Sequence, residues 1–155
     1  MDTLEKLEFQ LASRLESVDF GEQHALRLAR KAGFSEEEQF EIKLSVRECL
    51  VNAVEHGNRW DPCKSIKLSF LLYPDRLVIQ VGDRGTGFNP DSLPDPLDGK
   101  ALKNVSGRGV FLIRSLMDDF QVRRRGGGGA EVTLTKSCMS RQEEAGCRLS
   151  NASAI

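Results

Sequence analysis

Residues 36–57 are the segment that most constrains the fold, because their apolar side chains recur at helical spacing. Read at roughly 100° per residue, the segment has one apolar and one polar side. The apolar side carries Ile42, Val46, Cys49, Leu50 and Ala53, and the polar side carries Glu48, Asn52, Glu55 and His56. Any domain built by this chain must bury the first side and leave the second open to solvent or to a ligand.

The ends of this helix are also marked. Ser35 followed by Glu38 has the form of a capping box, which predicts a helix start at this point. Gly57 is placed to end the helix, so the predicted helix runs from Ser35 to Gly57.

Glu48 and Asn52 are separated by four residues, which places a carboxylate and an amide one turn apart on the polar side. A carboxylate can accept a proton, and an amide oxygen can hold a hard cation such as Mg²⁺. Phosphate chemistry with Mg²⁺ needs both of these groups. Taken alone, the pair is weak evidence for such chemistry, because Glu and Asn four residues apart are common on an ordinary solvated helix face.

The segments before this helix predict a strand followed by another helix. Leu7, Phe9 and Leu11 alternate with polar residues, as in a half-buried strand. Apolar residues at helical spacing then extend over 15–29, and Gly33 is placed to end that helix in a left-handed conformation.

The segments after it predict strands and one more helix. Residues 65–72 and 76–81 read as an antiparallel hairpin that turns at Pro74-Asp75. Residues 107–117 have a helical pattern. The two final strands, 120–125 and 131–135, are joined by four glycines.

Two further segments lack periodicity. Residues 89–106 contain three prolines and read as a long loop that can act as a lid. The polar residues from Lys136 onward predict a disordered tail. The expected division is therefore one domain over 1–136 and a tail over 137–155.

Composition narrows the possible partners. The formal net charge of −1 argues against nucleic acid or an anionic membrane as the main partner. No segment of about 18 apolar residues and no signal-like start is present, so we expect a soluble, cytoplasmic protein. The four cysteines, Cys49, Cys63, Cys138 and Cys147, lack metal-site spacing and are expected to be reduced.

Two glycine-containing elements can carry chemistry. The first, Asp83-x-Gly85-x-Gly87, directly follows a predicted strand. Glycines at this place let the backbone approach a flat ligand closely. The carboxylate can accept a hydrogen bond from an exocyclic amine of such a ligand. Gly107-x-Gly109 opens a helix, whose free N–H groups suit phosphate, and Arg108 adds a positive charge. Each element alone could be only a turn or a helix start.

The order of these elements resembles the N, G1 and G2 boxes of the GHKL ATPase superfamily, which has the Bergerat fold. Within it, residues 5–136 resemble the small bacterial anti-sigma factor serine kinases. The resemblance implies an α+β, two-layer sandwich: a mixed, mainly antiparallel sheet with helices on one face. The order βα-α-ββ-α-ββ obtained from the periodicities agrees with it.

The resemblance also implies a role for each matching residue. Glu48 matches the general base, Asn52 the Mg²⁺ ligand, and Asp83 the carboxylate that binds adenine. Gly85 and Gly87 shape the base pocket, whereas Gly107, Arg108 and Gly109 lie at the phosphates of ATP. His56 is given no chemical step.

One position departs from the family. Such proteins usually have Gly-Thr entering the last strand, with the threonine hydroxyl near adenine, whereas this chain has Gly129-Ala130. Nucleotide affinity is therefore in question, and Thr133 could replace the missing hydroxyl only through a different approach.

Two functions from different classes follow. The first is an ATP- and Mg²⁺-dependent serine/threonine protein kinase that phosphorylates an anti-sigma factor antagonist and sequesters a sigma factor, acting as a homodimer. The alternative is a nucleotide-gated protein-binding switch without significant phosphoryl transfer. The presence of Glu48 favours the kinase, because binding of Mg²⁺ and adenine needs no base at that position.

Overall fold

The computed structural model describes residues 2–85 and 107–138. Along the chain they form β1 (Glu5–Ala12), α1 (Leu15–Ala32), α2 (Glu36–Asn52), η1 (Ala53–Gly57), β2 (Ser65–Leu72), β3 (Arg76–Gly82), α4 (Gly107–Leu116), β4 (Asp119–Arg124) and β5 (Ala130–Ser137). The predicted order of strands and helices is confirmed.

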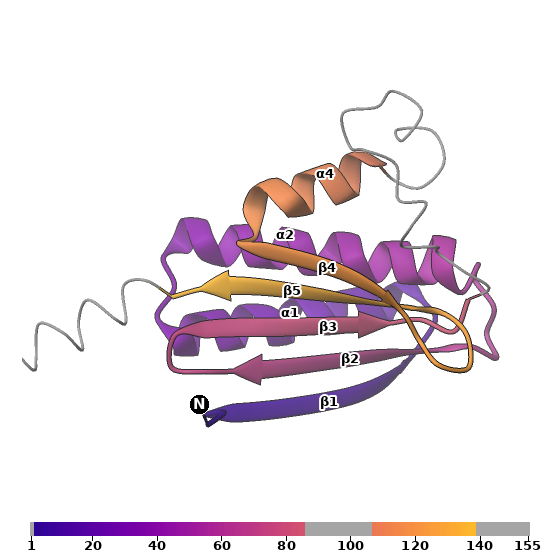
Figure 1. Ribbon diagram of the computed structural model, residues 1–155, viewed down its shortest axis with the longest axis horizontal. Helices are drawn as coiled ribbons and strands as arrows, with labels where there is room; N and C mark the ends of the chain where they lie inside the picture. The colour runs from indigo at the N-terminus through magenta and orange to yellow at the C-terminus, as the bar shows by residue number, and fades with distance from the viewer. Residues whose placement is uncertain (1, 86–106, 139–155) are drawn as a thin grey trace, which may run out of the picture.

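The strands form one five-stranded sheet in the order β1-β2-β3-β5-β4 (Figure 1). All four pairings between the described strands are antiparallel. The helices pack on one face of this sheet, with α2 in contact with both α1 and α4. The expected two-layer α+β sandwich is confirmed, although the sheet is antiparallel throughout rather than mixed.

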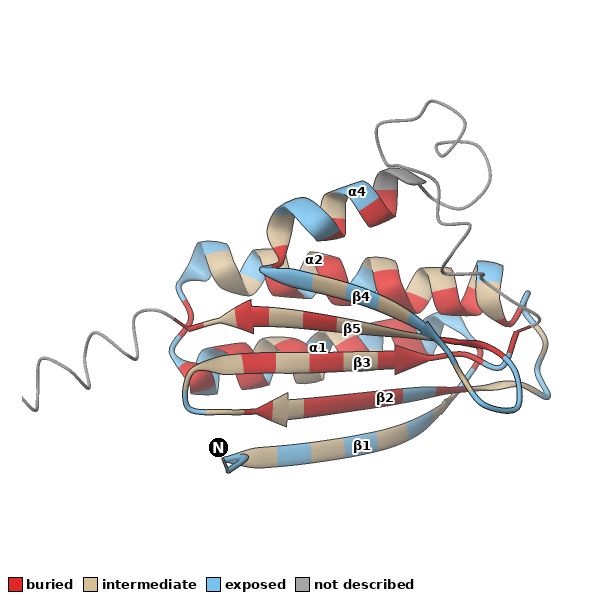
Figure 2. Ribbon diagram, viewed as in Figure 1, coloured by how far each residue is buried: buried red, intermediate tan, exposed pale blue. Residues whose placement is uncertain are grey.

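The core lies between the sheet and the helices. On β2, the alternate residues Ile66, Leu68, Phe70 and Leu72 are all buried, and Figure 2 shows the buried segments along the central strands and the facing sides of the helices. The residues predicted on the apolar side of the helix are buried as well: Ile42, Val46, Cys49 and Leu50 of α2, and Ala53 of η1. Their burial fixes α2 against the sheet and so determines which of its residues face the site.

The predicted helix ends are largely confirmed. Ser35 Oγ accepts from the Glu38 N–H at 3.1 Å, and the Glu38 carboxylate accepts from the Ser35 N–H at 3.0 Å. Gly33 ends α1 with φ of 82°. The far end of α2 differs from the prediction, because the α-helix ends at Asn52 and continues to Gly57 as a π-helical turn.

The boundary of the final strand is also corrected. The prediction placed Lys136 at the start of a disordered tail, but β5 continues to Ser137, pairing with β3 up to Arg76. Lys136 is buried and bonded to Glu41 of α2, which polarity alone could not reveal. Residues 139–155 of the predicted tail lie outside the described residues. None of the helices that the structure describes is long and apolar enough to span a membrane.

Candidate nucleotide-binding site

At the end of α2 the backbone continues as the π-helical turn η1, which has more residues per turn than an α-helix. The Asn58 N–H bonds to the Ala53 carbonyl at 2.8 Å, and the Trp60 N–H bonds to the Val54 carbonyl at 2.9 Å. Single π turns of this kind occur frequently at functional sites. Here the turn brings Gly57 against the side chain of Asp83, at the end of β3.

Asp83 is buried, with 8% of its surface exposed. Its Oδ1 accepts hydrogen bonds from the N–H groups of Gly85, at 2.9 Å, and Ala130, at 3.2 Å. Its Oδ2 lies towards Gly57 and accepts no hydrogen bond from the described residues. One carboxylate oxygen therefore fixes the side chain, while the other remains available to a ligand donor.

Three glycines make this arrangement possible. A Cβ on Gly57 would collide with the Asp83 carboxylate, and a Cβ on Gly85 would collide with the Gly57 carbonyl. Gly129 has φ of 96°, and a Cβ there would collide with the Asp83 carbonyl. Close backbone packing of this kind is open only to glycine, so three chain segments converge on Asp83.

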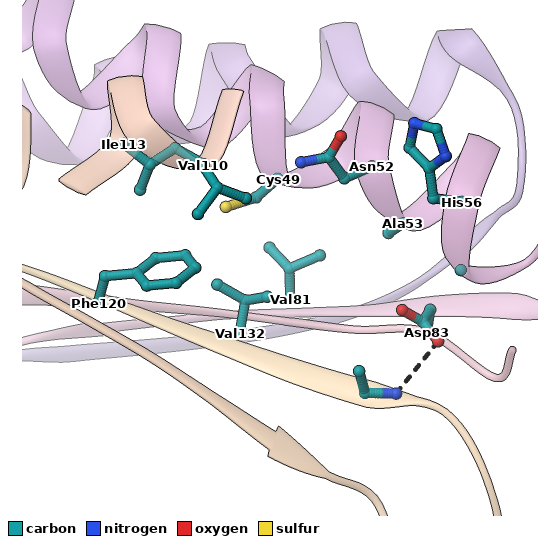
Figure 3. A pocket seen from close by; sticks show the side chains of 12 residues that line it. Cys49, Asn52, Ala53, His56, Val81, Asp83, Val110, Ile113, Phe120 and Val132 are labelled. Carbon is teal, nitrogen blue, oxygen red and sulfur yellow. Dashed lines mark hydrogen bonds between the residues drawn. The ribbon is translucent and has the colours of Figure 1, made fainter. Parts of the chain in front are cut away.

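A cavity of about 40 Å³ lies between α2, α4 and the sheet. Figure 3 shows Asn52 and His56 on the helix side and Asp83 on the sheet side at one end, with apolar side chains at the other. Its lining residues are Cys49, Asn52, Ala53, His56, Gly57, Val81, Asp83, Val110, Ile113, Phe120, Ala130 and Val132. Val110 and Ile113 of α4 form one wall of this cavity, so the position of α4 determines how much room a ligand has between α2 and the sheet.

Asn52 fits the role of a cation ligand. It lines the cavity, and its Oδ1 is buried without a hydrogen-bond partner among the described residues. A buried amide oxygen without a partner costs free energy, and a hard cation held between that oxygen and phosphate would satisfy it. The described residues contain no cluster of three or more His, Cys, Asp or Glu residues that could hold a metal without a phosphate.

Glu48 lies one turn before Asn52 on α2 and is half-buried. It is not among the residues that line the cavity. Its neighbour Cys49 does line the cavity, and burial raises the pKa of the Cys49 thiol, with a smaller contribution from the Glu48 carboxylate. The Cys49 thiol therefore stays protonated and acts as an apolar wall.

The phosphate-side residues are only partly described. α4 begins at Gly107, as predicted, and Gly109 is buried. The side chain of Arg108 is not described. Gly87 and the predicted lid over 89–106 lie outside the described residues.

The structure resolves the question about Thr133. Val132 lines the cavity, and neighbouring strand residues point to opposite faces, so Thr133 points away from the cavity. It cannot supply the hydroxyl that Ala130 lacks. Ala130 instead donates its N–H to Asp83 Oδ1, a bond that needs no particular side chain.

Two positioning residues were missed by the sequence analysis, Asn58 and Arg125. Asn58 is fully buried. Its Oδ1 accepts a hydrogen bond from the Arg84 N–H at 2.7 Å. Its Nδ2 donates to Ser13 Oγ and to the Ser65 carbonyl, each at 3.1 Å. Arg125 donates to the Asp83 carbonyl at 2.8 Å. No periodicity or motif marks such residues, because an asparagine after a glycine reads as a turn and an arginine near four glycines reads as solvated.

Asn58→Ala is expected to lower the free energy of unfolding by about 2–3 kcal/mol, because it leaves the Arg84 N–H and the Ser65 carbonyl without partners. It should also reduce the preference for ATP over GTP, since the strand end that carries Asp83 loses its support. Asn58→Asp is the comparison variant: it keeps the acceptor for the Arg84 N–H, but it replaces the donor to the Ser65 carbonyl with a buried carboxylate oxygen. Urea unfolding and competition binding measure the two effects, and an unchanged ATP/GTP ratio in Asn58→Ala would limit Asn58 to a purely structural role.

Two features fit a nucleotide-binding domain of the ATPase class: the sheet has helices on one face, and Asn52 and Asp83 line the same cavity. The histidine kinase-like ATPase domain family matches residues 11–136. The chain belongs to this family.

Within the family, the chain is similar to proteins named serine-protein kinase RsbW. It is 30% identical over 146 residues to the one from Listeria monocytogenes serotype 4a, covering 90% of this chain and 92% of the relative. It is 31% identical over 150 residues to the one from Bacillus mycoides, and this match covers 93% of this chain and 92% of the relative.

A solved structure shares the fold. It contains the RsbU and RsbW domains of Rv1364c from Mycobacterium tuberculosis, and it matches with a TM-score of 0.61 and 20% identity over 85% of this chain. This chain spans 32% of the length of that structure.

Proposed function

We propose that this chain is an ATP-dependent serine/threonine protein kinase that acts as an anti-sigma regulatory factor. It phosphorylates a small antagonist protein and, in the alternate partner state, sequesters a sigma factor. The observation that carries the proposal is the pair of open acceptors in one cavity, Asp83 Oδ2 and Asn52 Oδ1. The similarity to serine-protein kinases over most of the chain supports the same function.

Each residue then has a defined task. Asp83 Oδ2 accepts a hydrogen bond from the adenine amine, while Gly85 shapes the base pocket by letting the backbone pack closely against Gly57. Asn52 holds Mg²⁺, which when bound neutralises charge on the phosphates. Glu48 accepts the proton of the attacking serine hydroxyl.

The phosphate side of the proposal rests on α4. Gly107 and Gly109 present backbone N–H groups at the start of this helix, where the helix dipole favours negative charge. Arg108 adds a positive charge for the terminal phosphoryl group, and Gly87 completes the base pocket. These four assignments follow from the family motif.

The proposed regulation is a competition for partners. An unmodified antagonist is bound, and the negative charge of the new phosphate at the contact favours its release. The kinase then returns to the sigma factor, which is bound by a homodimer of this chain. Cytoplasmic location follows from these partners.

The direct test is transfer of labelled phosphate from ATP to a serine-bearing antagonist encoded beside this protein. Asp83→Asn is the sharpest variant, because its Oδ1 can keep both backbone hydrogen bonds while an amide replaces Oδ2. Losing this contact should weaken ATP binding by about 1–3 kcal/mol and leave the fold intact. Calorimetry measures the affinity, and an unchanged value would remove Asp83 from the base pocket.

A further inference from the structure

A polar hollow lies on the sheet face opposite the helices. Its volume is about 360 Å³, and its lining residues are Glu8, Phe9, Gln10, Ser65, Lys67, Arg84 and Arg125. None of these residues lines the nucleotide cavity. In Figure 1, α1 and α2 lie behind the strands, so no described helix covers this face.

The hollow is electrostatically unbalanced. Three of its side chains are cations, and none of Lys67, Arg84 and Arg125 forms an ion pair with a residue that the structure describes. Its one carboxylate, Glu8, pairs with Lys6 at 3.4 Å. A chain with a formal net charge of −1 thus concentrates positive charge at one place.

The local backbone explains why the cations gather there. Gly82 lacks a side chain, and a Cβ at this position would lie only 3.1 Å from Arg125 Nη1, so the guanidinium can lie close to the strand. On the neighbouring strand, Lys67 pairs in register with Gly82. Arg84 follows two residues after Gly82, and its neighbour Asp83 belongs to the nucleotide cavity.

The other polar side chains near the hollow either form a hydrogen bond with each other or lie opposite a residue of the other charge. Gln10 Nε2 donates to Ser65 Oγ at 3.0 Å. Glu131, next to Gly82 on β5, is opposite Arg123 in the register of β4. Lys67 and Arg84 are therefore the cations left to receive a ligand, whereas Arg125, which already donates to the Asp83 carbonyl, can offer only its remaining N–H groups.

We propose that this hollow is a binding site for a compact oxyanion, the phosphate or carboxylate group of a ligand or partner. Guanidinium groups bind such anions through directed hydrogen bonds, and an ammonium adds a point charge. The site is distinct from the nucleotide cavity and lies on the other side of the strand end that carries Asp83. Arg125 contributes to both, because it also donates to the Asp83 carbonyl.

The test uses the full-length chain labelled with ¹⁵N and without nucleotide, so its outcome is independent of the kinase assay. Chloride is replaced by inorganic phosphate, and in a second arm by the acetylated dipeptide Glu-Glu, at constant ionic strength. Saturable shifts are expected at the amides of Lys67 and of residues 82–85, with a dissociation constant on the order of millimolar. The arm that saturates at the lower concentration identifies the source of the anion.

Arg84→Gln and Lys67→Gln should each weaken this binding by about fivefold or more. Lys43→Gln is the matched control, since Lys43 is exposed on α2, away from the hollow. Arg125 is left unchanged because it also holds Asp83. The proposal is overturned if neither anion gives saturable shifts, or if Arg84→Gln and Lys43→Gln bind both anions as the unmodified chain does.

Discussion

Glu48→Ala is expected to slow phosphoryl transfer to the antagonist by roughly 10²- to 10⁴-fold, the usual contribution of a positioned general base. ATP affinity should change little, because Glu48 does not line the cavity that contains Asn52 and Asp83. Glu48→Gln is the isosteric control, which keeps size and removes the proton acceptor. Single-turnover phosphate incorporation and calorimetry on each variant measure the two quantities separately.

Asn52→Ala provides the contrast to Glu48→Ala. It removes the buried amide oxygen that would hold Mg²⁺, so nucleotide affinity and transfer should fall together. If Glu48→Ala transfers phosphate as fast as the unmodified chain, the kinase mechanism is wrong. The nucleotide-gated binding switch would then be the better account of the same cavity.

Much of the fold was predictable because it depends on local pattern. The alternation over 65–72 and the helical spacing over 36–57 each identify a buried side, and Ser35 and Gly33 mark helix ends through their own backbone preferences. The boundary at Lys136 was not predictable in this way. Its burial depends on Glu41, 95 positions away in the sequence, and no local pattern encodes that contact.

The site was predictable in part for the same reason. Asp83 and Asn52 could be singled out because a carboxylate before glycines and an amide on a helix face have recognisable chemistry. Asn58 and Arg125, which hold the backbone around Asp83 in place, could not be singled out. They act through backbone groups that only tertiary packing brings to them. The π-helical turn, which brings Gly57 against Asp83, likewise has no signature in the amino-acid pattern.

Lys136→Met is expected to lower the free energy of unfolding by about 3 kcal/mol, because it breaks a largely buried ion pair and leaves Glu41 without its partner. Lys136 Nζ lies 2.6 Å from Glu41 Oε2 and also donates to the Leu116 carbonyl at the end of α4. The Lys136 and Glu41 side chains are only 10% and 21% exposed, so solvent weakens the pair less than it would at the surface.

The same substitution should also weaken ATP binding. Lys136 joins α2 to the C-terminal end of α4, whose Val110 and Ile113 form one wall of the nucleotide cavity. Without this anchor, α4 loses a fixed position over the site. Urea unfolding and calorimetry test both effects, with Lys43→Met, an exposed lysine on α2, as control. In a double-mutant cycle, Glu41→Gln should lower the free energy of unfolding much less in the Lys136→Met background than in the unmodified chain. Equal losses of unfolding free energy in both backgrounds would show that the two side chains are not coupled.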